Sequence, residues 1–373
     1  MTFRMMRVRS PLCVLALSIA FFFLCDLLIF RSNFYPRFLT ENSVGTLAYR
    51  VDRERHRTIP PGTKSLLLVG NSQVERGFSP TQFDRDFPNS GIHIMRADAS
   101  KTYEEVWFYE LKHIDPNHDK YSAILITLPD YKIEPFGGFG SIENYTVATL
   151  LAPFVSPSDW IDIIGRFKGM RLRVAELALF ASHRYSFDLQ DLFLDWELRM
   201  RVYQYKMTSG DAFDGEPPVV PGAWKDLTIQ GDKVVNCVAP YNHFDCDDLE
   251  YTLRPVPKDE GQAITEINVA YERKWLGKII DLYKGSKTQL IFVQMPRSPV
   301  PLPRRTPIAG APDVRDFFAG IPNVTFVDEN LMKKFETPEY MHDHAHVSMA
   351  AGPEFTKTLG AEIVKIMAGI PPS

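Results

Sequence analysis

Two short segments at opposite ends of the chain combine residue types that can carry out nucleophilic chemistry. An apolar stretch, 65–69, runs into Gly70-Asn71-Ser72, and near the other end Asp343 stands three residues before His346. An apolar run that stops at a glycine is typical of a buried parallel strand that delivers a side chain to the edge of a sheet. A serine becomes a nucleophile when a base takes its proton and an acid orients that base. Ser72, His346 and Asp343 are therefore the candidate nucleophile, base and orienting acid.

Each segment also has an ordinary interpretation. A serine at a strand-to-helix turn often serves as the N-cap of the helix. The late turn contains His342 and His344 as well as His346, so a metal site is an alternative there. Three histidines on one short loop cannot easily face a single ion, because neighbouring side chains diverge. We favour catalysis over metal binding and expect no metal and no cofactor.

The elements that must position these residues follow from the apolar pattern. Strands are expected at 65–69, 91–95, 122–127, 289–293 and 324–327, and helices after Ser72 and at 103–111, 264–283 and 354–367. Alternating strands and helices predict an α/β fold with a parallel sheet covered on both faces. Binding sites in such folds lie at the carboxyl ends of the strands. The polar residues that follow the five strands are Ser72, Ser100, Asp130, Arg297 and His346.

The alternation stops between about 135 and 262, which predicts a largely helical insertion with its strongest helices at 174–180 and 189–205. We expect a leader and anchor at 1–31 and a stalk at 32–60, with a short helix at 43–49 and a solvated charge run at 52–57. The main domain is expected at 61–373, with the insertion inside it.

The N-terminal segment has the composition of a membrane anchor. Residues 12–25 are almost wholly apolar, Asp26 interrupts the run and 27–30 continue it, which gives close to the roughly 20 residues that a bilayer demands. Arg4, Arg7 and Arg9 precede the run, so the N-terminus should stay in the cytoplasm. A cleaved signal peptide is the alternative, but no small-x-small site follows. We expect a single-pass protein of the cytoplasmic membrane whose C-terminal domain faces the periplasm or exterior.

Charge and cysteine usage agree with an exported domain. The 373 residues have a net charge of −4, which argues against a nucleic-acid partner. Cys237 and Cys246 lie in one polar loop, and in an oxidising compartment such a pair is expected to form a disulfide. Two free thiols or a zinc site are the alternatives. His243 is the only other soft ligand nearby, whereas zinc takes four.

The early and late segments together resemble the SGNH (GDSL-like) hydrolase superfamily. Its serine lies in a Gly-Asp/Asn-Ser block, and its acid and base share a late Asp-x-x-His block. Gly77-Phe78-Ser79-Pro80, and Ser348 to Gly352 followed by Phe355-Thr356, resemble the membrane-anchored branch that is similar to polysaccharide O-acetyltransferases and D-alanyl-transfer proteins. The resemblance implies a flavodoxin-like three-layer sheet. It also implies acyl transfer or ester hydrolysis on an exported glycan or envelope polymer, from an acylated donor, and it allows a membrane-embedded acyl-transfer partner.

The oxyanion hole departs from the family pattern. Ala99-Ser100-Lys101 stands where the family has a glycine, and Thr127-Leu128-Pro129-Asp130 where it has Gly-x-Asn-Asp. Proline has no N–H and an ionised aspartate cannot donate, so the hole is either rebuilt or incomplete. Ser100 and Asp130 remain candidate oxyanion or substrate residues, and Arg297 could meet an acidic sugar or a phosphate. The departure leaves a non-catalytic module that binds glycan or an envelope partner as the alternative function.

Overall fold

A computed structural model describes most of the chain. The described residues are 11–32, 34–35, 46–97, 103–128, 145–186, 228–230, 233–235, 257–299, 312–342 and 345–372, with 189, 194, 196, 197, 200 and 253. The chain divides into two compact units. Unit 1 comprises Met1–Tyr49 and Ala148–Gly210, and unit 2 comprises Arg50–Val147 and Asp211–Ser373. The predicted insertion at 135–262 is thus shared between the two units.

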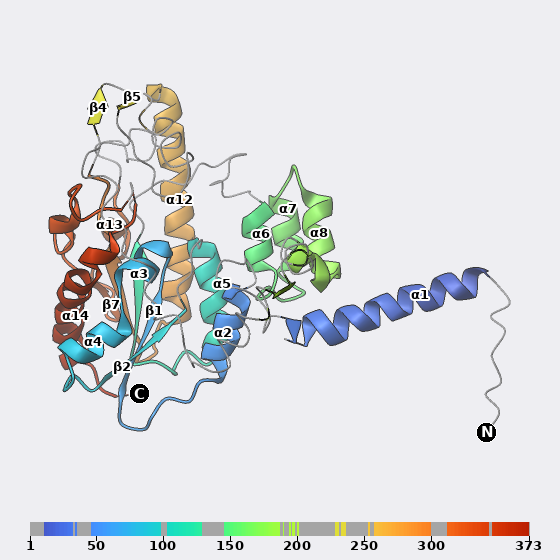
Figure 1. Cartoon of the computed structure of the whole chain (residues 1–373), viewed down its shortest axis with the longest axis horizontal. Coiled ribbons are helices and arrows are strands. Elements are labelled where there is room, and N and C mark those ends of the chain that lie inside the picture. The colour runs from blue at the N-terminus through green and yellow to red at the C-terminus, as the bar shows by residue number, and fades with distance from the viewer. Residues whose placement is uncertain are drawn as a thin grey trace. The chain divides into compact units, whose positions relative to one another are not determined.

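Unit 2 is built on the predicted parallel sheet. Its strands lie in the order β2-β1-β3-β6-β7 and all pair in parallel (Figure 1). The bounds are β1 Lys64–Val69, β2 Ile92–Arg96, β3 Ala123–Leu128, β6 Gln289–Gln294 and β7 Val324–Phe326. Counted within the sheet this is the doubly wound order 2-1-3-4-5, which reverses direction at the junction of β1 and β3. The prediction of an α/β fold with a parallel sheet is confirmed.

Helices cover both faces of this sheet. Helices α4 (Pro80–Asp86) and α14 (Gly352–Ala368) lie on one side, and α5 (Glu104–Ile114) and α12 (Lys258–Leu282) lie on the other (Figure 1). Side chains alternate along a strand. Leu66 and Leu68 pack in one cluster with Phe355 and Leu359 of α14. Leu67 and Val69, which are also fully buried, therefore face the opposite layer. Short helix α13 (Val314–Phe318) packs against α12.

The charge run predicted at 52–57 lies mostly in helix α2 (Thr46–His56) and is at least partly exposed except at Glu54. Glu54 is fully buried, and its carboxylate accepts hydrogen bonds from Arg53 and Arg57. The Lys120 ammonium group also donates to the carbonyl of Glu54. A carboxylate can be buried when cations surround it, and these cations come partly from distant sequence.

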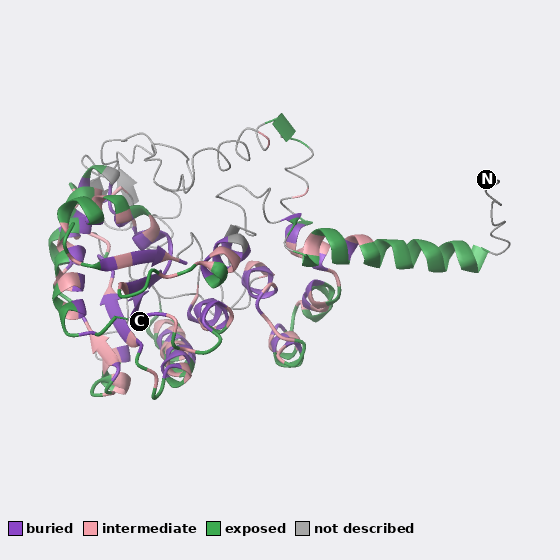
Figure 2. Ribbon diagram, turned by 90° about the horizontal axis from the view of Figure 1, so that it is seen from below, coloured by how far each residue is buried: buried purple, intermediate pink, exposed green. Residues whose placement is uncertain are grey.

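Unit 1 contains the apolar N-terminal helix. Helix α1 (Pro11–Cys25) continues into η1 (Asp26–Arg31), and among the described residues these 21 form one helix long and apolar enough to cross a membrane. At about 1.5 Å per residue they span about 31 Å, close to the thickness of a hydrocarbon core. Its side chains are exposed along almost its whole length (Figure 2). The unit also contains α7 (Trp160–Arg166), α8 (Arg171–Leu179) and η3 (Ala181–Tyr185).

The smaller elements include α6 (Tyr145–Leu151), at the boundary of the two units, and the antiparallel pair β4 (Thr228–Gln230) and β5 (Lys233–Val235). Two short 3-10 helices, η5 (Lys333–Phe335) and η6 (Met349–Ala351), flank the late turn. Most of the predicted helix at 189–205, the stalk residues 36–45 and the cysteine pair Cys237 and Cys246 lie outside the described residues.

Candidate active site

The candidate site begins at Gly70, directly after the end of β1 at Val69. A Cβ atom on Gly70 would lie 2.0 Å from the hydroxyl of Thr127 on the neighbouring strand β3. Only glycine therefore lets the ends of β1 and β3 come this close. The reversal of strand order lies at this same junction, which is where doubly wound folds bind their ligands.

Asn71, not Ser72, is the N-cap of helix α3 (Ser72–Gly77). Its Oδ1 accepts the backbone N–H of Gln73 at 3.0 Å, and its own backbone is extended. The interpretation of Ser72 as a mere N-cap is therefore wrong. Ser72 is the first residue of the helix and is 9% exposed. Its hydroxyl is not used to cap α3 and is available for another partner.

That partner is His346, whose Nε2 lies 2.7 Å from Ser72 Oγ. The histidine stands on a loop whose base is closed by pairing between Met341 and Val347. The His342 N–H donates to the His346 carbonyl at 2.7 Å, and the Ser348 N–H donates to the Tyr340 carbonyl at 2.6 Å. These pairings hold His346 beside the end of β1.

Gln73 connects this loop to α3. Its Nε2 donates to the carbonyl of Ala345 at 2.9 Å, and its Oε1 accepts from the Asn71 amide at 3.3 Å. Gln73 is only 2% exposed. Gln73, which follows Ser72, therefore holds Ala345, which precedes His346. Sequence reasoning missed Gln73, since the only signal for it was its place beside Ser72.

A second connection joins α3 to the helix that follows the late turn. The Ser79 N–H donates to Thr356 Oγ1 at 3.0 Å. A Cβ atom on Gly77 would lie 3.1 Å from the ring of Phe355, so the absence of a side chain at Gly77 lets α14 pack closely. The segments 77–80 and 355–356, both noted in the sequence, are thus in direct contact.

The dyad has the geometry of a general base and its nucleophile. When the neutral imidazole carries its hydrogen on Nδ1, His346 Nε2 can accept a hydrogen bond from the Ser72 hydroxyl, and the distance between the two atoms is normal for such a bond. The predicted orienting acid Asp343 lies outside the described residues, as do His344, Ser100 and Asp130. Among the residues that the structure describes, no group of three histidine, cysteine or acidic side chains could hold a metal ion.

A buried acid lies in the first turn of α5, after strand β2. Glu104 is 2% exposed, and burial raises the pKa of its carboxyl to about 7. This carboxyl is therefore partly protonated near neutral pH, unlike an ordinary glutamate. Sequence reasoning did not single it out, since a glutamate in the first turn of a helix is common.

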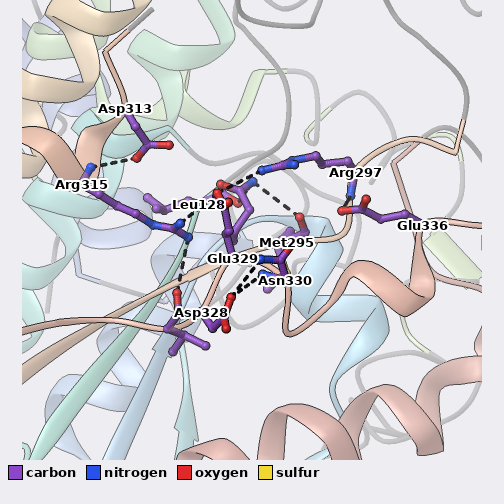
Figure 3. A network of polar contacts seen from close by, with 11 residues as sticks. Leu128, Met295, Arg297, Asp313, Arg315, Asp328, Glu329, Asn330 and Glu336 are labelled. Atoms are coloured by element: carbon purple, nitrogen blue, oxygen red, sulfur yellow. Dashed lines mark hydrogen bonds and ion pairs between the residues drawn. The ribbon is translucent and has the colours of Figure 1, made fainter. Parts of the chain in front are cut away.

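Arg297 follows β6 and belongs to a polar network at the ends of β6 and β7 (Figure 3). Its guanidinium lies 3.6 Å from the Glu329 carboxylate, which also pairs with Arg315 at 3.0 Å. The Arg297 N–H donates to the Glu336 carboxylate at 3.1 Å. The side chain is 49% exposed. The positive charge of Arg297 is therefore partly neutralised by Glu329, which weakens the prediction that Arg297 binds an acidic sugar or a phosphate.

No family model matches the sequence, and comparison with curated proteins finds no relative.

Proposed function

We propose that the protein is a membrane-anchored, extracytoplasmic serine acyltransferase or esterase that acts on O-acyl groups of an exported glycan or cell-envelope polymer. The observation that carries the proposal is the 2.7 Å contact between Ser72 Oγ and His346 Nε2. The dyad forms where β1 meets β3, at the carboxyl edge of a doubly wound sheet, which is the place where such folds bind substrates.

The proposed reaction has two steps. Ser72 Oγ attacks the carbonyl carbon of an ester while its proton passes to His346 Nε2. When the tetrahedral intermediate collapses, the ester C–O bond breaks and the leaving alcohol takes that proton, which leaves an acyl-enzyme. A sugar hydroxyl or water then attacks the acyl carbon, gives its proton to His346, and Ser72 departs with that proton. Transfer and hydrolysis use the same residues and differ in how well water is excluded.

The supporting groups are part of the proposal. Asp343 would hold the Nδ1–H of His346 and stabilise the imidazolium that forms. The Ser72 N–H would donate to the developing oxyanion, with Ser100 and Asp130 as the candidates for further contacts. The partners would be an acylated donor, a glycan or polymer acceptor and the membrane, with a membrane-embedded acyl-transfer protein as a possible source of the donor.

The SGNH assignment has support from three features. The strand order is 2-1-3-4-5, the serine follows the first strand, and the histidine precedes the last helix. The contact of Gly77 with Phe355 joins the two segments that carry the resemblance. These features agree with an acyl-transfer enzyme of that superfamily, with a non-catalytic glycan- or partner-binding module as the alternative.

A fluorophosphonate probe tests the proposal on the full-length protein in membranes. The probe should label the wild type, and Ser72→Ala and His346→Ala should each reduce labelling to background. The double variant should be no worse than either single one, because members of a catalytic unit act together. His342→Ala, in the same loop, is the control and should keep its labelling. A folded wild type that is never labelled would favour the binding module.

A further inference from the structure

The acid that interrupts the apolar helix is an attachment point within unit 1. Asp26 is 2% exposed, and its carboxylate accepts the N–H groups of Ala181 at 3.1 Å and Ser182 at 2.8 Å. It also accepts from Arg31 Nε at 3.1 Å, and Arg31 Nη2 donates to the carbonyl of Leu179 at 2.6 Å. The start of η3 and the end of α8 are therefore joined to the last turn of the apolar helix.

Ring contacts extend this junction along the apolar helix. Phe180 lies with its ring centroid 5.6 Å from those of both Phe22 and Phe23. Phe22 precedes Arg31 by nine residues, which is about 13 Å along a helix axis. The whole apolar helix is only about as long as a hydrocarbon core is thick. A residue that touches Phe22 must therefore lie at the depth of the membrane and not above it in water.

The surface of this part of unit 1 suits a lipid environment. Ile161, Leu172 and Leu179 are 77%, 82% and 59% exposed, and the two leucines lie seven residues apart on one face of α8. The exposed basic residues of the same segment are Lys168, Arg171 and Arg173. A ring cluster of Phe30, Tyr35 and Tyr185 lies at the Arg31 end of the apolar helix, where tyrosines commonly sit at the headgroup level.

We infer that α7, α8 and η3 form a subdomain that lies in the outer leaflet of the membrane. Its exposed leucines contact acyl chains, and its arginines and lysine meet lipid phosphates, as in interfacial helices. Asp26 fixes the subdomain to the apolar helix. This inference rests on the proposed membrane anchor. Lipid, and not a soluble partner, covers the exposed leucines. The contacts of Phe180 with Phe22 and Phe23 place Phe180 inside the membrane, at a depth that a soluble partner could not reach.

Site-specific labels test the inference in the full chain. Cys13, Cys25, Cys237 and Cys246 are replaced by serine, and an unchanged circular dichroism spectrum and unfolding temperature check that this background remains folded. Leu172→Cys and Leu179→Cys carry an environment-sensitive dye, and Lys365→Cys on α14, at a side chain 75% exposed, is the matched control. The protein is reconstituted in vesicles of phosphatidylcholine and phosphatidylglycerol. Iodide should quench the leucine-site dyes roughly fivefold less than the control dye, because interfacial helices sit about 5–10 Å into the lipid. Nitroxide lipids should quench them more.

The outcomes separate this inference from the proposals on which it rests. Equal iodide quenching at Leu172 and Lys365 in a chain that stays with the vesicles contradicts the inference alone. Protection that appears only at high protein-to-lipid ratios indicates a second copy and also contradicts it. A chain that washes off the vesicles contradicts the membrane anchor and the inference together. Asp26→Leu should expose the Leu172 dye to iodide without releasing the chain, and unchanged quenching would overturn the role of Asp26. Ser72 labelling in the same samples reports on the enzyme proposal separately.

Discussion

Four successive residues at the end of β1 each contribute something different to the candidate site. Gly70 permits the close approach of β3, Asn71 caps α3, Ser72 meets His346, and Gln73 holds the histidine loop. A change at any of these positions should act through a different physical effect. The effect of Gln73 can be separated most cleanly, because its amide contacts the loop and not the serine.

Gln73→Met should slow fluorophosphonate labelling of Ser72 by roughly 10- to 100-fold, because a small displacement of the base costs that much in reaction rate. Methionine keeps the volume of the side chain and removes the hydrogen bond to Ala345. Gln294→Met is the matched control, since Gln294 also donates to a backbone carbonyl, that of Leu128 at 3.3 Å. Both variants should lower the unfolding temperature similarly. Equal labelling rates in the two variants would show that Gln73 does not position the base.

Single residues differ in how far the sequence reveals them. Ser72 and His346 could be predicted because their residue types and neighbouring residues indicate a nucleophile and a base. Gln73 could not, because its bond to Ala345 joins residues 272 apart and leaves no local pattern. Asp26 appeared only as an interruption of the apolar run, since its partners Ala181 and Ser182 are backbone groups of a distant segment.

At the scale of elements, the five strands of the parallel sheet were predicted to within one residue at each end, whereas the pair β4 and β5 in the predicted insertion was not predicted. Buried parallel strands are nearly continuous apolar runs, so their limits are visible in the sequence. Helix limits were less accurate. Helix α12 begins at Lys258, six residues before the predicted start. The prediction missed these residues because they are polar and exposed, so they show no helical spacing of apolar side chains. The charge run in α2 led to the prediction that all of its residues are solvated. Glu54 is instead buried, because Arg53 and Arg57 pair with its carboxylate.

The buried carboxyl in the first turn of α5 predicts a pH dependence. The pKa of Glu104 is about 7 in the folded protein and about 4.5 in an unfolded chain. Between these values the folded state holds a proton that the unfolded state has lost, so stability falls as pH rises through this window. The loss is on the order of 3 kcal/mol at most. Glu104→Gln should flatten the fall in unfolding temperature between about pH 5 and about pH 8.

The control for this experiment is Glu266→Gln on the exposed side of α12. It should leave the pH dependence of the wild type intact. If Glu104→Gln and Glu266→Gln give the same slope of unfolding temperature against pH, Glu104 is not the group that titrates.

Two helical glycines in unit 2 should respond to alanine in opposite directions. A Cβ atom on Gly360 of α14 would lie 2.6 Å from the ring of Phe87 and 2.9 Å from that of Phe83. Gly360→Ala should therefore destabilise the packing of α14 on α4 by about 1–3 kcal/mol. On α12, a Cβ atom on Gly277 would meet Phe318 at an ordinary 3.5 Å, so Gly277→Ala should stabilise the helix by up to about 1 kcal/mol. Chemical unfolding measures the change in the free energy of unfolding for each variant. Changes of the same sign in Gly360→Ala and Gly277→Ala would refute this account of α14.

At the scale of the whole molecule, the division into two units was the feature least visible in the sequence. Residues 148–210 were predicted to belong to an insertion within the main domain, and the structure groups them with the N-terminal helix. The contacts that join them involve Phe22 and Phe23, which in the sequence look like ordinary members of a membrane segment, and Asp26, which appears there only as an interruption. Grouping of distant segments depends on such contacts, which a single sequence does not display.

The orientation of the chain in the membrane is a further prediction at this scale. A reporter enzyme fused after Ser373 should be active on the exported side, and the fusion should remain with membranes after a high-salt wash. Replacement of Arg4, Arg7 and Arg9 by alanine should mix the two orientations, because these charges set the sidedness. A reporter active only in the cytoplasm would contradict the predicted topology, and a shortened soluble product would indicate a cleaved signal.

The first strand and the last helix of unit 2 are held together. The Lys64 ammonium group at the start of β1 donates to the carbonyls of Met367 and Ala368 at 2.6 and 3.2 Å, across 303 residues of sequence. Closing a loop of that length costs about 5 kcal/mol of chain entropy beyond a constant. Ser72 is synthesised early and His346 late, so the two side chains cannot meet until most of unit 2 has been made. A chain truncated before His346 would therefore lack the Ser72–His346 contact on which the proposed acyl chemistry depends.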